Sequence, residues 1–294
     1  MSSSSIQPLP SFPLNVYTPI AEAGDGMFGV VYFSMRNSDY ALAQQNKSTN
    51  TYEELKSKLL TVKVLKHTAS SVYSEVMANL ELREAVTNFG HYGHHTDAFA
   101  LVENAHLSWL ATRAVVPGMM LDELVERIQG LPLAVLLQYF IDAVEIVRFI
   151  NKVANPPILH GDVHGRNILL DPSKPNVLGM PSLVLIDFST SRADVAQSGV
   201  HHPRLDLQNV FNRFTADMDC CADLKQFRTT DFPELFEFDL SHDELKRRIQ
   251  KRLDDVLTET DPSSIETFKQ RVEAATAEKD NALLLAFREA GLLE

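Results

Sequence analysis

An aspartate and an asparagine five positions apart, Asp162 and Asn167, are the residues whose chemistry is clearest in this chain. The Asp162 carboxylate can accept a proton from a hydroxyl group or orient that group for attack. The Asn167 amide oxygen is a hard ligand of the kind that magnesium prefers. This combination suits phosphoryl transfer, in which a protein mainly positions a hydroxyl and neutralises the charge of a triphosphate. The alternative interpretation is a polar turn before the short buried strand that residues 168–170 predict.

A second carboxylate, Asp187, follows the four-residue apolar run 183–186, which is typical of a fully buried strand. A carboxylate at that position is unfavourable unless it accepts hydrogen bonds or binds a cation. We therefore interpret Asp187 as the principal magnesium ligand, and an aspartate that caps the next turn is the alternative. The separation of 20 residues from Asn167 exceeds what a tight hairpin needs, so we expect a loop over residues 172–181.

Gly24, Gly26 and Gly29 form a Gly-x-Gly-x-x-Gly pattern, which lets the backbone fold closely over phosphates. The same pattern opens a helix in dinucleotide sites, but here the strand-like residues 30–33 follow it. Together with the two carboxylate motifs, this hairpin resembles the protein-kinase-like superfamily. The resemblance implies that ATP is the phosphoryl donor, that the glycines cover its phosphates, and that Val31 contacts the adenine ring.

The resemblance also implies a lysine that binds the α and β phosphates and a glutamate that pairs with it. Lys63 fits the first role because valines flank it within the strand-like residues 60–66, whereas Lys66 is better explained as a solvated strand end. Glu75, in the helix that we expect over residues 70–89, fits the second role. Two further glutamates of this helix remain alternatives, Glu81 and Glu84.

Residues 107–113 read as a strand that leads into an extended hinge at residues 114–118. The resemblance implies that backbone groups of Ala114 and Val116 contact adenine there. Arg113 takes a position at which the family usually has an apolar or small residue.

Periodicity predicts the elements that surround these motifs. Residues 34–59 form an insertion whose polar composition indicates a mobile surface loop. Residues 121–129 predict a short helix, and the apolar stripe of residues 133–153 predicts a long buried helix under the catalytic loop. Three amphipathic stretches predict a helical C-terminus, residues 241–257, 263–277 and 281–292.

Substitutions within the motifs indicate an atypical member of the superfamily. Gly161 replaces an arginine that in many protein kinases pairs with a phosphorylated loop, so we do not expect control by loop phosphorylation. His164 replaces a lysine, and the resulting loop is more similar to that of aminoglycoside and choline phosphotransferases. His164 either helps to neutralise the transferred phosphoryl group or only orders the loop. Ser189 replaces the glycine of Asp-Phe-Gly, as in relatives whose metal-binding loop does not swing.

The connection after the metal-binding loop is short. Residues 191–205 contain no Ala-Pro-Glu signature, which in protein kinases belongs to the platform for a peptide substrate. The shortness of this segment argues against the usual mode of peptide binding. The helix that follows is predicted to begin at Asp206, with its side chain as the cap.

Composition limits the alternatives. The formal net charge of −12 disfavours nonspecific binding to nucleic acid or to anionic membranes, and it fits a cationic acceptor. The only cysteines, Cys220 and Cys221, are adjacent, which excludes a disulfide framework and fits a reducing compartment. No apolar run is long enough for a membrane helix, and residues 1–13 lack the features of a signal peptide, so we expect a soluble cytoplasmic protein. Three histidines lie close together in the sequence, His91, His94 and His95. They lack the spacing of a known metal site, so we interpret this segment as a polar turn.

We therefore expect an α+β protein with a bilobal, protein-kinase-like fold. Residues 1–13 are expected to form a flexible tail, and residues 14–113 an N-lobe with a small antiparallel sheet and one helix. Residues 114–118 are expected to form a hinge, and residues 119–294 a mostly helical C-lobe. The implied reaction moves the γ-phosphoryl group of ATP, with Mg2+, to a hydroxyl of a protein or of a small molecule. The alternative is a catalytically inert pseudokinase that acts as a nucleotide-binding scaffold or interaction module.

Overall fold

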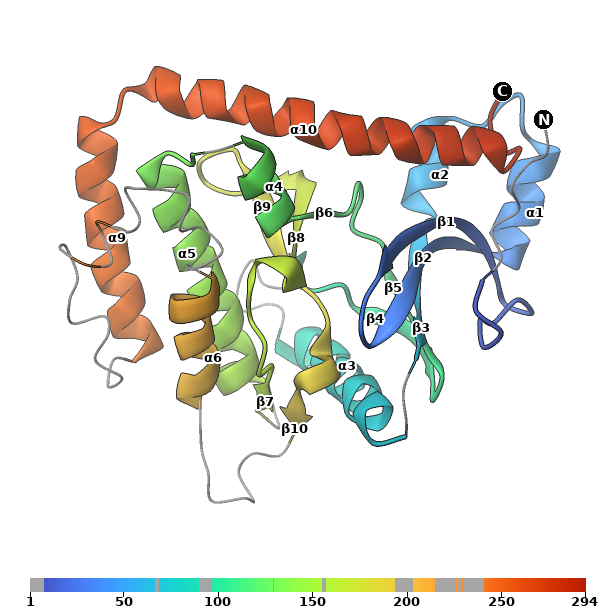
Figure 1. Ribbon diagram of the computed structural model, residues 1–294, viewed down its shortest axis with the longest axis horizontal. Helices are drawn as coiled ribbons and strands as arrows, with labels where there is room; N and C mark the ends of the chain where they lie inside the picture. Colours follow the sequence, from blue (N-terminus) through green and yellow to red (C-terminus); the bar gives the residue numbers. More distant parts are fainter. Residues whose placement is uncertain are drawn as a thin grey trace.

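The computed structural model describes residues 8–66, 69–89, 97–128, 130–154, 157–193, 203–214, 226, 229 and 241–294. These residues form an antiparallel sheet followed by a mostly helical region (Figure 1), so the α+β class predicted from the sequence is confirmed. The histidine cluster and the cysteine pair, for which the sequence also gave predictions, lie outside these described ranges. They are His91, His94 and His95, and Cys220 and Cys221.

The sheet has five strands in the order β1-β2-β3-β5-β4, and each neighbouring pair is antiparallel. The strands are β1 Tyr17–Asp25, β2 Gly29–Arg36, β3 Leu60–Leu65, β4 Val102–His106 and β5 Trp109–Arg113. Alternation along β3 explains its position, because Val62 and Val64 are fully buried on one face while Lys63 points to the other. The strand predicted around Lys63 is therefore present, at the centre of the sheet.

The insertion between β2 and β3 folds into two short helices, α1 Asn37–Gln45 and α2 Tyr52–Ser57, so the prediction of a mobile loop was wrong. Thr51 caps α2 in a capping box with Glu54, which satisfies backbone donors at the helix start. Ala43 and Leu55 are buried and anchor the two helices. The apolar contacts are too few to give the insertion a clear periodic pattern in the sequence.

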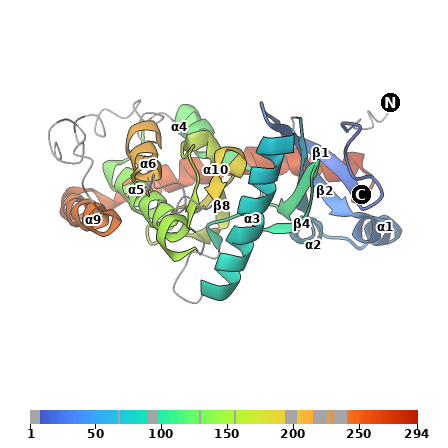
Figure 2. The ribbon, with the colours of Figure 1, turned by 90° about the horizontal axis from the view of Figure 1, so that it is seen from below.

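Helix α3, Ala69–Phe89, matches the helix predicted over residues 70–89. It packs against β4 on one side and against the short turn η5, Phe188–Thr190, on the other. Figure 2 shows α3 lying between the sheet and the helical region. A residue of α3 can therefore contact groups from both parts of the molecule.

The helical region is built around α5, Leu133–Arg148, which is buried along most of its length and continues as the π-helical turn Phe149–Val153. The helices packed against it are α6 Pro203–Asn209 with the π-helical turn η6 Val210–Phe214, and α9 His242–Glu259. Helix α4, Leu121–Ile128, contributes to the same apolar core. The helices predicted over residues 121–129 and 133–153 are thus confirmed. Its large apolar core includes Val163 and Ile168 and so gives a closely packed base to the loop of residues 160–167, which carries Asp162 and Asn167.

Short strands carry the loops that hold the motifs. A three-stranded sheet joins β6 Met119–Met120, β8 Ile168–Pro175 and β9 Pro181–Leu185, and a second pair joins β7 Ile158–Leu159 and β10 Arg192–Ala193. The loop predicted over residues 172–181 is shorter than expected, because β8 continues to Pro175 and pairs there with Pro181. This pairing fixes β8 beside β9.

Helix α10, Pro262–Glu289, is one continuous helix of 28 residues, where the sequence predicted two separate stretches. It starts beside α9 and ends beside α1 and α2 (Figure 1). Leu283 and Phe287 near its end are buried in a cluster with Phe33, Met35 and other apolar residues of the sheet and the insertion. Helix α10 therefore connects the helical region to the sheet. Among the described residues, none of the helices combines the length and hydropathy that crossing a bilayer demands.

Candidate active site

The hairpin between β1 and β2 carries the glycine pattern and lies next to Lys63. Gly26 N donates to Gly29 O at 2.9 Å, which closes the turn, while Gly24 pairs with Val31 and Val31 pairs with Lys63 across the strands. A Cβ atom added to Gly29 would lie 2.6 Å from Val64 O and 3.2 Å from Cγ of Lys63. Only glycine therefore permits this close approach of the hairpin to β3.

Lys63 connects two carboxylates that come from different parts of the chain. Its Nζ lies 2.6 Å from Oε1 of Glu75 on α3 and 2.9 Å from Oδ1 of Asp187. Of the alternatives weighed for these roles, Lys66 pairs with Asp25 of the hairpin and Glu84 is exposed. The structure thus brings together the lysine, the glutamate and the second aspartate that the motifs indicated.

Burial and charge shift the pKa values of this group in different directions. Burial lowers the pKa of Lys63, but the carboxylates of Glu75 and Asp187 raise it above its ordinary value. Burial raises the pKa of Glu75, and the Lys63 ammonium opposes that rise. Burial also acts to raise the pKa of Asp187, yet Lys63 and the hydrogen bond from Ser189 lower it below its ordinary value. Asp187 therefore stays ionised, as a cation ligand must be.

Asp187 holds an unusual backbone conformation, with φ of 62° and ψ of 75°. This left-handed region is unfavourable for a residue with a Cβ atom and is found mainly where surrounding contacts enforce it. Ser189 N donates to Oδ1 of Asp187 at 3.3 Å, and Ile186 N donates to Asn167 O at 2.9 Å. These bonds aim the carboxylate and hold the end of β9 beside Asn167.

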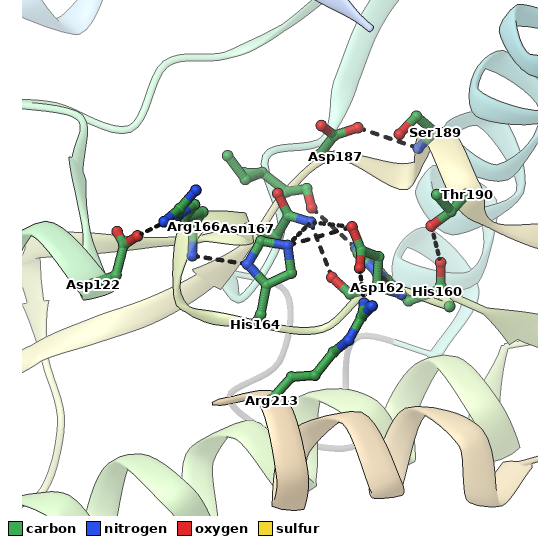
Figure 3. Close-up of polar contacts among 12 residues, drawn as sticks. Asp122, His160, Asp162, His164, Arg166, Asn167, Asp187, Ser189, Thr190 and Arg213 are labelled. Atoms are coloured by element: carbon green, nitrogen blue, oxygen red, sulfur yellow. Dashed lines mark hydrogen bonds and ion pairs between the residues drawn. The ribbon is translucent and has the colours of Figure 1, made fainter. Parts of the chain in front are cut away.

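The loop of residues 160–167 forms its own hydrogen-bond set around Asp162 (Figure 3). Asn167 Nδ2 donates to Asp162 O at 2.9 Å and to its Oδ2 at 3.3 Å, which leaves the amide oxygen Oδ1 for a cation. His164 Nδ1 accepts from Arg166 N at 3.2 Å, and its other nitrogen, Nε2, lies 3.3 Å from Oδ2 of Asp162 and 3.2 Å from Nδ2 of Asn167. His164 thus orders the loop, which was one of its two predicted roles.

Asp206 supports the loop from below, and the sequence interpretation of this residue was wrong. Helix α6 begins at Pro203, so Asp206 is not the cap. Its fully buried carboxylate accepts from the backbone N–H groups of His160 and Gly161, both at 2.7 Å, and from Nδ2 of Asn151 at 3.0 Å. A buried carboxylate with these donors fixes the backbone just before Asp162.

The backbone conformation of the loop explains why residue 161 is a glycine. Its φ is +79°, and a Cβ atom there would lie 3.2 Å from Thr190 O.

Neighbouring His160 is buried and its pKa is lowered mainly by that burial, which keeps the ring neutral. The ring binds both loops, with Nε2 3.0 Å from Ile186 O and Nδ1 accepting from Asp162 N at 3.3 Å. The loop of residues 160–167 and the turn that carries Asp187 are therefore held together.

The residues predicted to form a hinge lie next to the end of helix α10. Ala114 and Val116 follow β5 and pack against the apolar cluster at the end of α10. Arg113, whose charge was unexpected at its position, has Nη1 3.3 Å from Oδ2 of Asp171 on β8. A carboxylate of β8 therefore neutralises the charge of Arg113.

Arg213 is a residue of the site that the sequence did not reveal. It projects from η6 and forms an ion pair with Oδ1 of Asp162. A single arginine on a predicted helix carries no pattern that identifies it as a contact of the catalytic loop. Only the packing of η6 beneath the loop places it there (Figure 3).

Asn167 and Asp187 fit a magnesium ion by the chemistry of their oxygens. Within the described ranges, no three or more histidine, cysteine or carboxylate side chains gather in a way that could enclose a metal. Magnesium is usually held by one or two protein oxygens together with phosphate oxygens and water, so the pair is sufficient for a nucleotide-bound ion.

No protein-family model matches this chain, and no curated protein shows significant similarity to it.

Proposed function

We propose that this chain is an ATP- and magnesium-dependent phosphotransferase with a protein-kinase-like fold, which moves the γ-phosphoryl group of ATP to a hydroxyl acceptor. The observation that supports this best is the bridge from Lys63 to Glu75 and Asp187, beside the loop of Asp162 and Asn167. A five-stranded antiparallel sheet with α3 behind it, followed by a helical region, is consistent with such a fold.

Each residue would have a role that follows from its position. Lys63, held in place by Glu75, binds phosphate oxygens of the nucleotide, while Asn167 and Asp187 hold the magnesium ion, which neutralises negative charge on the triphosphate. Asp162 orients the acceptor hydroxyl and takes its proton. The acceptor oxygen forms a bond to the γ-phosphorus as the bond from that phosphorus to the ADP oxygen breaks.

Nucleotide binding is tested first, because it does not require the acceptor to be known. Calorimetric titration of the purified chain with ATP and magnesium is expected to show binding that Lys63→Met weakens at least tenfold, since the variant loses the cation that faces the phosphates. Lys251→Met, which changes an exposed lysine on α9, is the matched control and should bind as the unchanged protein does. Absence of binding by the unchanged chain would refute the proposal.

Transfer is tested second, with labelled ATP, magnesium and a panel of alcohols and serine peptides. Asp162→Asn is expected to keep ATP affinity and lose at least 100-fold in transfer rate, because the amide cannot take the hydroxyl proton. Asp255→Asn, at an exposed position of α9, controls for the loss of a negative charge. Binding without transfer above the Asp162→Asn level would favour the inert nucleotide-binding scaffold.

A further inference from the structure

We infer that the acceptor carries a carboxylate or phosphate group and that Arg213 binds this group. The inference rests on the proposed function and deepens it by naming the class of acceptor. It begins with the ion pair between Arg213 and Asp162, which occupies one oxygen of the carboxylate that is to meet the acceptor hydroxyl. An acceptor hydroxyl that approaches this oxygen therefore competes with the guanidinium for it.

Buried side chains anchor the segment that carries Arg213, although the side chain of Arg213 itself is accessible. Phe211 and Phe214 on either side of Arg213 are buried, and their rings lie 5.8 Å and 6.3 Å from that of Phe140 on α5. The side chain of Arg213 is 54% exposed and that of Asp162 is 27% exposed. Ion pairs with this exposure contribute little net free energy, so the guanidinium can exchange Asp162 for another anion at low cost.

The position of Arg213 assigns it to the acceptor and not to the nucleotide. Lys63 engages Asp187, whereas Arg213 engages Asp162. In Figure 3, Arg213 and Asp187 lie on opposite sides of Asp162. A group that enters beside Arg213 would therefore approach Asp162 from the side away from the metal ligands.

The chemistry of a guanidinium determines the kind of group that it selects. Its planar donors match the paired oxygens of a carboxylate or phosphate, and such charge-assisted bonds are stronger than bonds to a neutral hydroxyl. An anionic group on the acceptor would draw Arg213 away and free Oδ1 of Asp162 for the reacting hydroxyl. A neutral or cationic acceptor would leave the ion pair in place. The net charge of −12 led us to expect a cationic acceptor. Arg213, however, places a positive charge directly beside Asp162, and this local charge favours an anionic acceptor.

The test uses matched six-carbon alcohols that differ in charge: glucose, glucosamine, gluconate and glucose 6-phosphate. Serine peptides flanked by glutamates or by lysines form a second arm, which distinguishes a protein source of the anion from a small molecule. Each compound is assayed for transfer from labelled ATP and for calorimetric binding without nucleotide. The variants are Arg213→Gln, Arg213→Lys and the control Arg247→Gln, which changes an exposed arginine of α9 that pairs with Glu244.

We expect binding and transfer with anionic compounds in at least one arm. Arg213→Gln should raise the KM for the anionic acceptor about tenfold and leave the KM for ATP unchanged. The KM of Arg213→Lys for the anionic acceptor should lie between those of the unchanged protein and Arg213→Gln. Arg247→Gln should change neither KM. The inference is overturned if turnover is confined to neutral or cationic compounds, if Arg213→Gln leaves the anionic KM unchanged, or if no anionic compound binds. Because acceptor binding is measured without nucleotide, its result is separate from the ATP titration that decides the proposed function.

Discussion

Replacing Phe287 by alanine should destabilise the protein more than any other single change at the end of α10. Phe287 is fully buried, and its ring packs edge-on against Tyr52 with 5.8 Å between the ring centres. Truncation of a buried phenylalanine to alanine usually costs about 3 to 5 kcal/mol, and the edge-on pair adds to the contacts that are lost. We therefore expect a loss of about 4 kcal/mol in the free energy of unfolding.

Urea unfolding measures this loss, followed by the fluorescence of Trp109, the only tryptophan, which reports on β5 in the sheet. Circular dichroism in the far ultraviolet follows the helices in the same samples. Leu285→Ala is the matched control, because Leu285 lies two residues earlier on the same helix and is 56% exposed, so its change should stay within about 0.5 kcal/mol. A loss below about 1 kcal/mol for Phe287→Ala, or an equal loss for the control, would refute the packing argument.

Two further predictions concern buried polar groups. Burial, with the nearby charge of Lys152, lowers the pKa of His242 to about 4. Above pH 6.5 this histidine is neutral in both the folded and the unfolded chain, so it does not reduce the free energy of unfolding there. As the pH falls from 6.5 to about 4, the unfolded chain takes up a proton that the folded chain does not, and we expect the free energy of unfolding to fall by about 3 kcal/mol from this residue. His242→Gln should remove that part of the pH dependence in urea titrations, and an unchanged profile would contradict the prediction. Asp206→Ala should cost at least about 3 kcal/mol, because buried donors on Asn151, His160 and Gly161 lose their acceptor. Asp206→Asn should cost less, and equal losses would argue against the role of the carboxylate as a shared acceptor.

The sequence predicted the residues whose roles depend on local spacing. Asp162 and Asn167 share one loop, so their separation alone was informative, and Lys63 stands in a strand that its own alternation reveals. Asp206 and Arg213 contact Asp162 or its neighbours only because η6 and α6 pack beneath the catalytic loop. Long-range packing of this kind leaves no mark in the spacing of a single sequence.

The continuity of α10 was also hidden in the sequence, and its polar residues explain why. Glu278, Lys279 and Asp280 interrupt the apolar pattern and suggested a break between two helices. In the structure each has a separate partner: Glu278 pairs with Arg127, Lys279 pairs with Glu123, and Asp280 accepts from Tyr52 at 2.7 Å. Polar residues that bind different elements around a helix cannot be distinguished from a polar linker by periodicity alone.

The end of α10 has a consequence for the order in which the chain can fold during synthesis. Ile20, Phe33 and Leu55 leave the ribosome early, but Leu283 and Phe287, which cover them, are translated more than two hundred residues later. Until then, part of the apolar surface of the first strands lacks its native cover and is open to contacts with other chains. Chaperone binding to nascent chains that end before residue 283 should therefore map to this surface, which gains its native cover only when the end of α10 has been made.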